Sequence, residues 1–197
     1  MKKTIKLNFT LAALLLFIGT VSLMVGDVAT SPAALVDWLA GVGSEFHVIL
    51  FETIRAPRIV LAALTGFVLG LSGVAIQGFL RNPLAEPGIL GASNGAALGA
   101  VMAIYSGLAS TVSYWVPLAA AVMALASVVV LMAVAGVGAS SLRLILAGFA
   151  VSAFAGAGIA LALNLSPNYF AALEIAFWLL GAVENRSWLH VSLALPG

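Results

Sequence analysis

The chain has 197 residues, of which 63% are hydrophobic and 8% are charged, and its mean hydropathy is +1.19. Soluble domains typically carry about 25% charged residues, so this composition excludes an ordinary soluble protein and indicates an integral membrane protein. The net charge of +1 is too small to indicate a nucleic-acid partner. The absence of cysteine excludes disulfides and thiolate metal sites.

Uncharged stretches long enough to cross a bilayer recur along the chain. A transmembrane helix needs about 17–25 apolar residues, and the predicted spans are 9–25, 59–80, 88–106, 112–136 and 144–165. A sixth apolar run, 188–197, is too short to cross. We therefore predict an all-α polytopic helix bundle, a single transmembrane domain over residues 1–197 with five complete spans and the start of a sixth, truncated at its C-terminus.

The basic amino terminus sets the predicted orientation. Lys2, Lys3 and Lys6 precede the first apolar run and could belong to a signal peptide. No small-residue cleavage site closes that run, which favours a retained first span. The positive-inside rule then places the N-terminus in the cytoplasm, and the same count assigns Arg81 and Arg143 to the cytoplasmic side.

The segment 26–55 falls on the outer side in this orientation and mixes aromatic with acidic residues, which is typical of an interfacial amphipathic segment. Ser31 before Pro32 is a candidate helix N-cap, and Ser44 is a second one. Pro57 fits the first turn of the span that follows.

Arg55 and Arg58 flank Pro57 on the side that the positive-inside rule disfavours. A cation beside a helix N-terminus also costs about 0.3–1 kcal/mol. Two explanations stay open. Glu52 neutralises one arginine, or both form a charged docking point for an acidic external partner, since opposite charges steer encounter and set register.

Glycines four residues apart recur in the second and third predicted spans. Such glycines line one helix face and allow another backbone to approach closely. We predict helix packing at Gly66, Gly70, Gly91, Gly95 and Gly99.

The connection between these two spans reads "QGFLRNPLAEPGILG". Arg81 lies at a helix C-terminus, where a cation is favoured, and Asn82 followed by Pro83 indicates a turn. Glu86 before Pro87 suits the start of the next helix. A well-specified turn with no further role is a sufficient explanation of this segment on physical grounds.

The fifth span is preceded by a short turn in which Ser140 or Ser141 can act as the N-cap. The segment after that span is rich in aromatic residues, as in an interfacial belt. These residues are Tyr169, Phe170, Phe177, Trp178 and Trp188.

No pattern for enzymatic chemistry is present. The chain has no G-x-x-x-x-G-K-[ST] motif, so it is not expected to bind ATP by that route. His47 and His190 have no second ligand at metal spacing, and we predict no catalytic residue, metal or cofactor. The centres of the spans lack Asp, Glu, Lys and Arg, which disfavours a proton-driven carrier. Transport energy would have to come from another subunit.

Three segments carry a family resemblance: "RAPRIVLAALTGFVLGLSGVAIQGFLRNPLAEPGILGASNGAALGAV", "LRLILAGFAVSA" and "FWLLGAVENRSW". Their motifs R-x-P-R, R-N-P-L-A-[DE]-P, L-G-x-S-x-G-A and L-A-G occur in order. The chain resembles the permeases of type II ABC importers, the family that handles iron-siderophores, haem and cobalamin. The resemblance implies a multi-pass permease of the inner membrane that is not itself an enzyme.

The same resemblance implies the partners: a second permease in a homo- or heterodimer, cytoplasmic ATP-binding subunits, and an external substrate-binding protein. Arg55 and Arg58 would meet acidic residues of the binding protein. The cytoplasmic turn and gate would comprise Arg81, Asn82, Pro83, Leu84, Ser141 and Leu142.

Family members continue through further spans beyond the sixth, so the chain corresponds to an amino-terminal portion. A ferric siderophore is the first expectation for the cargo, and haem or cobalamin are alternatives because the motifs are shared. A non-transporting scaffold or a truncated membrane fragment is the alternative from a different functional class.

Overall fold

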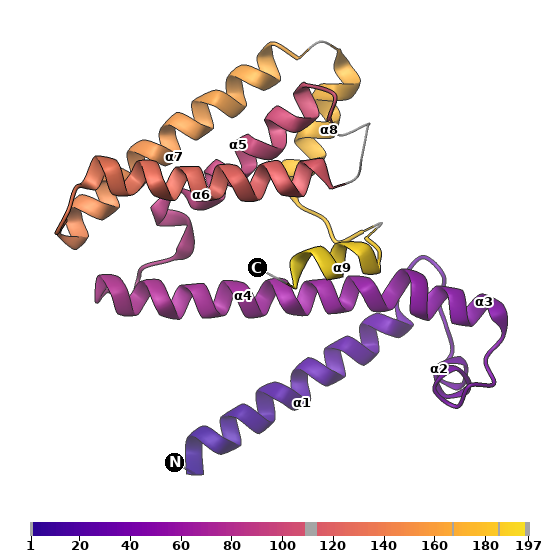
Figure 1. Ribbon diagram of the computed structural model, residues 1–197. Coiled ribbons are helices and arrows are strands. Elements are labelled where there is room, and N and C mark those ends of the chain that lie inside the picture. Colours follow the sequence, from indigo (N-terminus) through magenta and orange to yellow (C-terminus); the bar gives the residue numbers. More distant parts are fainter. Residues whose placement is uncertain (1, 109–113, 167, 185, 196–197) are drawn as a thin grey trace. The chain divides into compact units, whose positions relative to one another are not determined.

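The computed structural model describes residues 2–108, 114–166, 168–184 and 186–195, and all regular structure in these ranges is helical (Figure 1). The elements are α1 (Lys2–Met24), α2 (Pro32–Leu39), α3 (Glu45–Val48), the π-helical stretch η1 (Ile49–Arg55), α4 (Ala56–Leu80), the 3-10 turn η2 (Pro87–Leu90), α5 (Ala92–Tyr105), α6 (Trp115–Ala135), α7 (Ser141–Asn164), α8 (Tyr169–Leu180) and α9 (Trp188–Ala194).

Within the described ranges, four helical segments are long and apolar enough to cross a membrane. They are Lys3–Met24, Glu45–Leu80, Trp115–Ala135 and Ser141–Asn164, while α5 and α8 are shorter apolar helices. The prediction of an all-α membrane protein with several spans is confirmed. The chain forms two compact units, Met1–Val68 with Val183–Gly197 (unit 1) and Leu69–Ala182 (unit 2).

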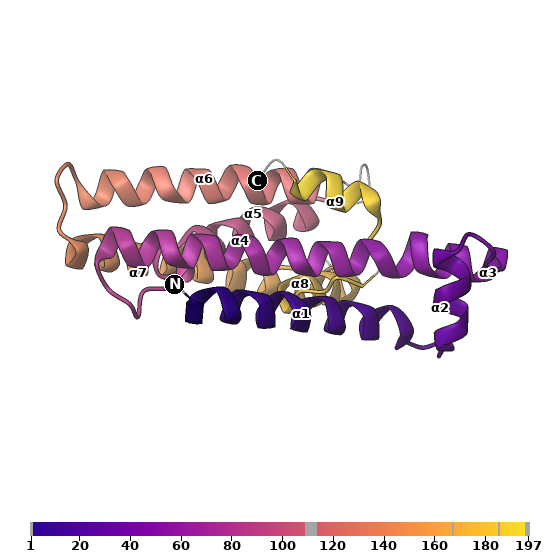
Figure 2. The ribbon, with the colours of Figure 1, turned by 90° about the horizontal axis from the view of Figure 1, so that it is seen from below.

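Unit 1 contains α1, α2, α3, η1, α9 and the first half of α4. Figures 1 and 2 show α2 running across the direction of α1. The Ser31 hydroxyl accepts from the Ala34 N–H at 3.2 Å, and the Ser44 hydroxyl accepts from the His47 N–H at 3.4 Å. Both predicted N-caps are confirmed, because capping depends on neighbouring residues only.

The second long segment begins earlier than predicted. Residues Glu45–Leu80 form one 36-residue helical stretch. Pro57 lies in the first turn of α4, as expected, but α4 continues directly from the π-helical stretch η1 and does not begin a separate helix. The interruption takes the form of η1, in which the Ala56 N–H donates to the Phe51 carbonyl five residues back. The predicted cost of cations at a helix N-terminus therefore does not apply to Arg55 or Arg58.

Unit 2 is built around α5, which packs on both α6 and α7. One core cluster of this unit joins Val101 and Ile104 of α5 to Ile175 of α8. The helix α8 begins where the Asn168 side chain accepts from the Ala171 N–H at 2.9 Å. The sequence pattern had indicated only an aromatic outer segment there.

Two of the five predicted packing glycines bring α5 against α6. A Cβ atom at Gly95 would overlap the Ser127 hydroxyl and lie 2.6 Å from the Ser127 Cβ. At Gly99 it would overlap the Ala119 carbonyl. At Gly66 and Gly70, no described heavy atom other than those of the adjoining helix backbone lies within 4 Å of the corresponding positions.

The third predicted span, 88–106, contains a helix of only 14 residues, α5. The stretch before it forms η2, which ends at Gly91 with φ of +78°. This left-handed conformation suits glycine. A Cβ atom at Gly148 of α7 would overlap the Ile89 carbonyl, so η2 lies directly on the backbone of α7.

We expect Gly95→Ala to destabilise the chain, because the added methyl group meets Ser127 inside the α5–α6 contact. Overpacking of this kind costs about 1–3 kcal/mol. The measurement is the denaturation midpoint in detergent. Gly156→Ala in α7 is the matched control, since its Cβ would meet nothing within 4 Å; equal destabilisation of both variants would contradict the α5–α6 contact.

Candidate functional site

The 81–86 turn of unit 2 is fixed by short-range hydrogen bonds. Arg81 has φ of +51°, and the Asn82 side-chain oxygen accepts from the Leu84 N–H at 2.9 Å. The Ala85 N–H donates to the Asn82 carbonyl at 3.1 Å. The Gln77 side-chain amide donates to the Ala85 carbonyl at 3.2 Å and so ties the turn to the end of α4.

The second turn, between α6 and α7, depends on glycine and a serine cap. Gly136 and Gly138 have φ of +82° and +69°, which favour glycine. The Ser140 hydroxyl accepts from the Arg143 N–H at 3.4 Å. Ser140 is thus the N-cap, and Ser141 is the first residue of α7.

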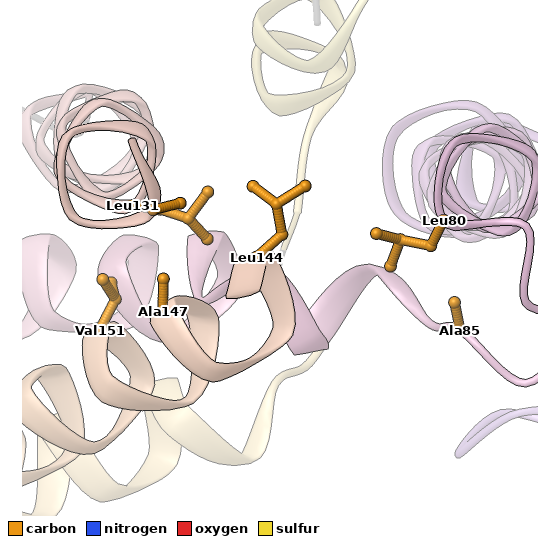
Figure 3. Close-up of a cluster of buried hydrophobic side chains, with 7 residues drawn as sticks. Leu80, Ala85, Leu131, Leu144, Ala147 and Val151 are labelled. Atoms are coloured by element: carbon orange, nitrogen blue, oxygen red, sulfur yellow. The ribbon is translucent and has the colours of Figure 1, made fainter. Parts of the chain in front are cut away.

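One apolar cluster anchors both turns at the same end of unit 2 (Figure 3). Leu80 precedes the first turn and Ala85 lies within it, and both are buried with residues of α6 and α7. Figure 3 shows Leu144, near the start of α7, directed toward Leu131 of α6. The remaining buried members are Ala135, Ala147 and Val151.

The tips of the turns are exposed, although their bases are buried. Leu84 is 86% exposed, and Leu142 is 66% exposed. Arg81 and Arg143 are exposed as well. A pocket of about 340 Å³ lies beside the second turn and is lined by Phe79, Met132, Gly136, Val137, Gly138, Ala139 and Leu144. The predicted gate residues are therefore gathered at one end of unit 2, beside the buried cluster that includes Leu80, Ala85 and Leu144.

Arg55, by contrast, is buried in unit 1, with 5% of its surface exposed. Its guanidinium donates to the carbonyls of Leu23 and Val28 and to the Thr30 hydroxyl at 3.1 Å. The guanidinium carbon lies 5.9 Å from the centre of the fully buried Phe51 ring, a favourable cation–π distance. Arg55 therefore fastens the connection between α1 and α2.

Arg58 is in a different environment. Its side chain is partly buried, and its Nε is a buried atom without a hydrogen-bond partner in the described chain. Glu52 does not neutralise either arginine within the described ranges; its carboxylate accepts from the Trp38 indole N–H at 3.1 Å. Docking by the two arginines stays a prediction, and the burial of Arg55 shifts it toward Arg58.

Two features of unit 1 were not found by sequence analysis. Both Trp38 and Trp188 bind Glu52, the first at its carboxylate and the second at its backbone carbonyl. The partners are 14 and 136 residues apart, so no local pattern could reveal them. The only signal in the sequence was the aromatic residue type within a predicted outer segment, which is typical of a membrane interface.

Each histidine lies in the first turn of a short helix and contacts the serine that caps that helix. His47 Nδ1 lies 2.8 Å from the Ser44 hydroxyl, and His190 Nδ1 accepts from the Ser187 N–H at 3.1 Å. The part of the chain that the structure describes contains no group of three or more His, Cys, Asp or Glu residues able to hold a metal ion.

We expect Arg55→Met to loosen the 24–30 connection, because methionine keeps much of the apolar stem and loses all three hydrogen bonds. Bonds to a charged group contribute about 1.5–3 kcal/mol each, so amide exchange in 24–30 should accelerate at least about tenfold. Arg58→Met is the control. Equal acceleration in both variants would show that Arg55 has no special role there.

Comparison with known proteins gives consistent results. The model of the FecCD transport family matches residues 14–197. The chain is 41% identical over 152 residues to the uncharacterized ABC transporter permease protein YvrB of Bacillus subtilis, covering 75% of this chain and 42% of that protein. It is 38% identical over 177 residues to the achromobactin transport system permease protein CbrC of Dickeya dadantii, covering 89% and 50%.

The vitamin B12 import system permease protein BtuC of Salmonella paratyphi A is 32% identical over 196 residues, which cover 98% of this chain and 58% of that protein. A solved ABC transporter assigned to the metal-chelate type, in an inward-facing conformation, superimposes with a TM-score of 0.75 at 29% identity, covering 93% of this chain and 54% of that one.

The chain spans about half the length of these relatives. The family match nevertheless extends over nearly all of its residues, and the fold agrees with that of the solved transporter. The chain belongs to the FecCD transport family.

Proposed function

We propose that the chain is part of the transmembrane permease of an ABC importer in the inner membrane, and that its cargo is a ferric siderophore. The observation that carries this proposal is the FecCD match over residues 14–197, supported by the likeness to a transporter of the metal-chelate type. CbrC is named for achromobactin and BtuC for vitamin B12, so haem and cobalamin are the alternative cargoes.

ATP hydrolysis belongs to separate cytoplasmic subunits in this proposal. The chain lacks a phosphate-binding loop, and the centres of its spans carry no ionisable side chain that could relay protons. The further partners are a second permease and an external substrate-binding protein. The N-terminus lies in the cytoplasm, as the basic residues of α1 favour.

The two turns of unit 2 form the cytoplasmic gate in this proposal. Their common core and exposed leucines, Leu84 and Leu142, support it. A gate must present side chains at a defined position, which requires a support that does not deform when the tip moves. The buried cluster beneath both turns provides such a support.

Docking of the binding protein is assigned mainly to Arg58. The Arg58 side chain keeps part of its surface exposed, unlike the buried Arg55, so in this proposal an incoming carboxylate forms charge-assisted hydrogen bonds with Arg58. Charge-assisted hydrogen bonds of this kind are stronger than neutral ones. Arg55 contributes indirectly, because it holds the adjoining 24–30 connection.

The function is tested by deleting the gene and measuring growth on single iron or cobalt-corrinoid sources. We expect loss of growth on ferric siderophores, with retained use of haem and cobalamin. Loss of haem or cobalamin use alone would transfer the proposal to that cargo. Unimpaired growth on all three sources would contradict an import function and favour the membrane-fragment alternative.

We expect Arg58→Glu to weaken binding-protein affinity for the assembled importer and to reduce the salt dependence of that affinity. Replacing an attractive contact with a repulsive one changes mainly the association rate and its response to salt. The measurement is binding kinetics at several salt concentrations. Arg81→Glu, at the opposite predicted face, is the control, and an Arg58→Glu variant with unchanged affinity and salt dependence would refute docking at this position.

A further inference from the structure

The backbone carbonyl of Glu52 has an unusual hydrogen-bond donor. It lies in the π-helical stretch η1, yet it accepts from the indole N–H of Trp188 at 2.8 Å. Both residues belong to unit 1. A helix-interior carbonyl ordinarily accepts from its own helix four residues ahead.

The Glu52 carbonyl accepts from Trp188 because neither of the two residues that could donate to it from within the helix does so. The Ala56 N–H, the normal α-helical donor, donates instead to the Phe51 carbonyl, five residues back. Pro57 would be the donor in the π-helical pattern, but proline has no N–H. The Glu52 carbonyl therefore has no donor from its own helix and accepts from the Trp188 indole instead.

The indole of Trp188 thus occupies the Glu52 carbonyl, to which the Ala56 N–H would donate in an α-helical register. Rewinding η1 into an α-helix moves the Ala56 N–H from the Phe51 carbonyl to the Glu52 carbonyl. Two donors then compete for one oxygen, and the bond from Trp188 favours the register in which Ala56 is engaged elsewhere.

A change of hydrogen-bond register in η1 would move the helical residues that precede it. In the α register each hydrogen bond spans one residue fewer than in the π register. The change would rotate the segment that precedes η1 by about 100° and displace it by about 1.5 Å relative to α4. That rotation carries Leu50 and Phe51 away from the face on which they are 8% and 0% exposed. It also reorients Glu52, whose carboxylate binds Trp38.

We propose that Trp188 is a positioning residue that holds residues 49–55 in the π-helical register by capping the Glu52 carbonyl. Release of this indole would permit rewinding to the α register and so turn the outer segment against α4. The proposal goes beyond the importer function, because it depends on neither the cargo nor the partner proteins.

The position of Trp188 makes it suited to such control. It is the first residue of α9, whose N-cap Ser187 exchanges side-chain and backbone hydrogen bonds with His190 in a capping box. The cap fixes the entry to α9 and therefore the place from which the indole extends. Movement of residues 186–195 would be transmitted through one hydrogen bond to the helix that carries Arg55 and Arg58.

The register can be measured by spin labelling, because the chain has no native cysteine. Cysteines replacing Phe46 and Phe67 place labels at exposed positions, 57% and 66%, on either side of η1 in unit 1. With Trp188→Phe, we expect pulsed electron-resonance measurements in nanodiscs to reveal a second distance population, displaced by the rotation and the rise of one residue.

Trp38→Phe is the matched control, because Trp38 binds the carboxylate of the same Glu52 and not its backbone. It should keep the parent distance. An unchanged distance in Trp188→Phe, or the same change in both variants, would overturn the proposal. If Trp188→Phe fails to fold, 3-benzothienylalanine at position 188 retains the ring shape without the N–H, and an unchanged distance in that variant overturns the proposal equally.

Discussion

Satisfaction of backbone hydrogen bonds in apolar surroundings is the constraint on which this structure depends. Each unsatisfied N–H or carbonyl in a bilayer costs several kcal/mol, so a helix can be interrupted only where its freed groups find other partners. At the start of α7 the partner is the Ser140 hydroxyl. At η1 it is the Trp188 indole, and at the end of α1 it is the Arg55 guanidinium, which accepts no bond and supplies several donors.

Close backbone contact between helices is a second constraint, and it shapes unit 2. Since lipid tails are as apolar as leucine, helices gain little from hydrophobic burial in a bilayer and associate through close packing. Gly95 and Gly99 bring α5 onto α6, and Gly148 brings α7 onto η2. These contacts leave little room for adjustment, and they help to hold the two turns of unit 2 in a fixed relation.

The sequence predicted those features that depend on neighbouring residues. Ser31 and Ser44 cap helices as expected, because a cap is formed within one turn. The burial of Arg55 could not be predicted, since its acceptors Leu23 and Val28 lie 32 and 27 residues away. Charge patterning presented that arginine as an exposed cation because the pattern contains no information about which carbonyls remain unbonded elsewhere in the fold.

The length of the helical segment Glu45–Leu80 has a consequence for how much of it a bilayer can cover. Its 36 residues extend roughly 50 Å, whereas the hydrocarbon core of a bilayer is about 30 Å thick. An ordinary tilt of about 20° removes only a few ångströms of this excess. If this segment crosses the bilayer, one or both of its ends therefore extend beyond the lipid tails into the polar headgroup region or past it.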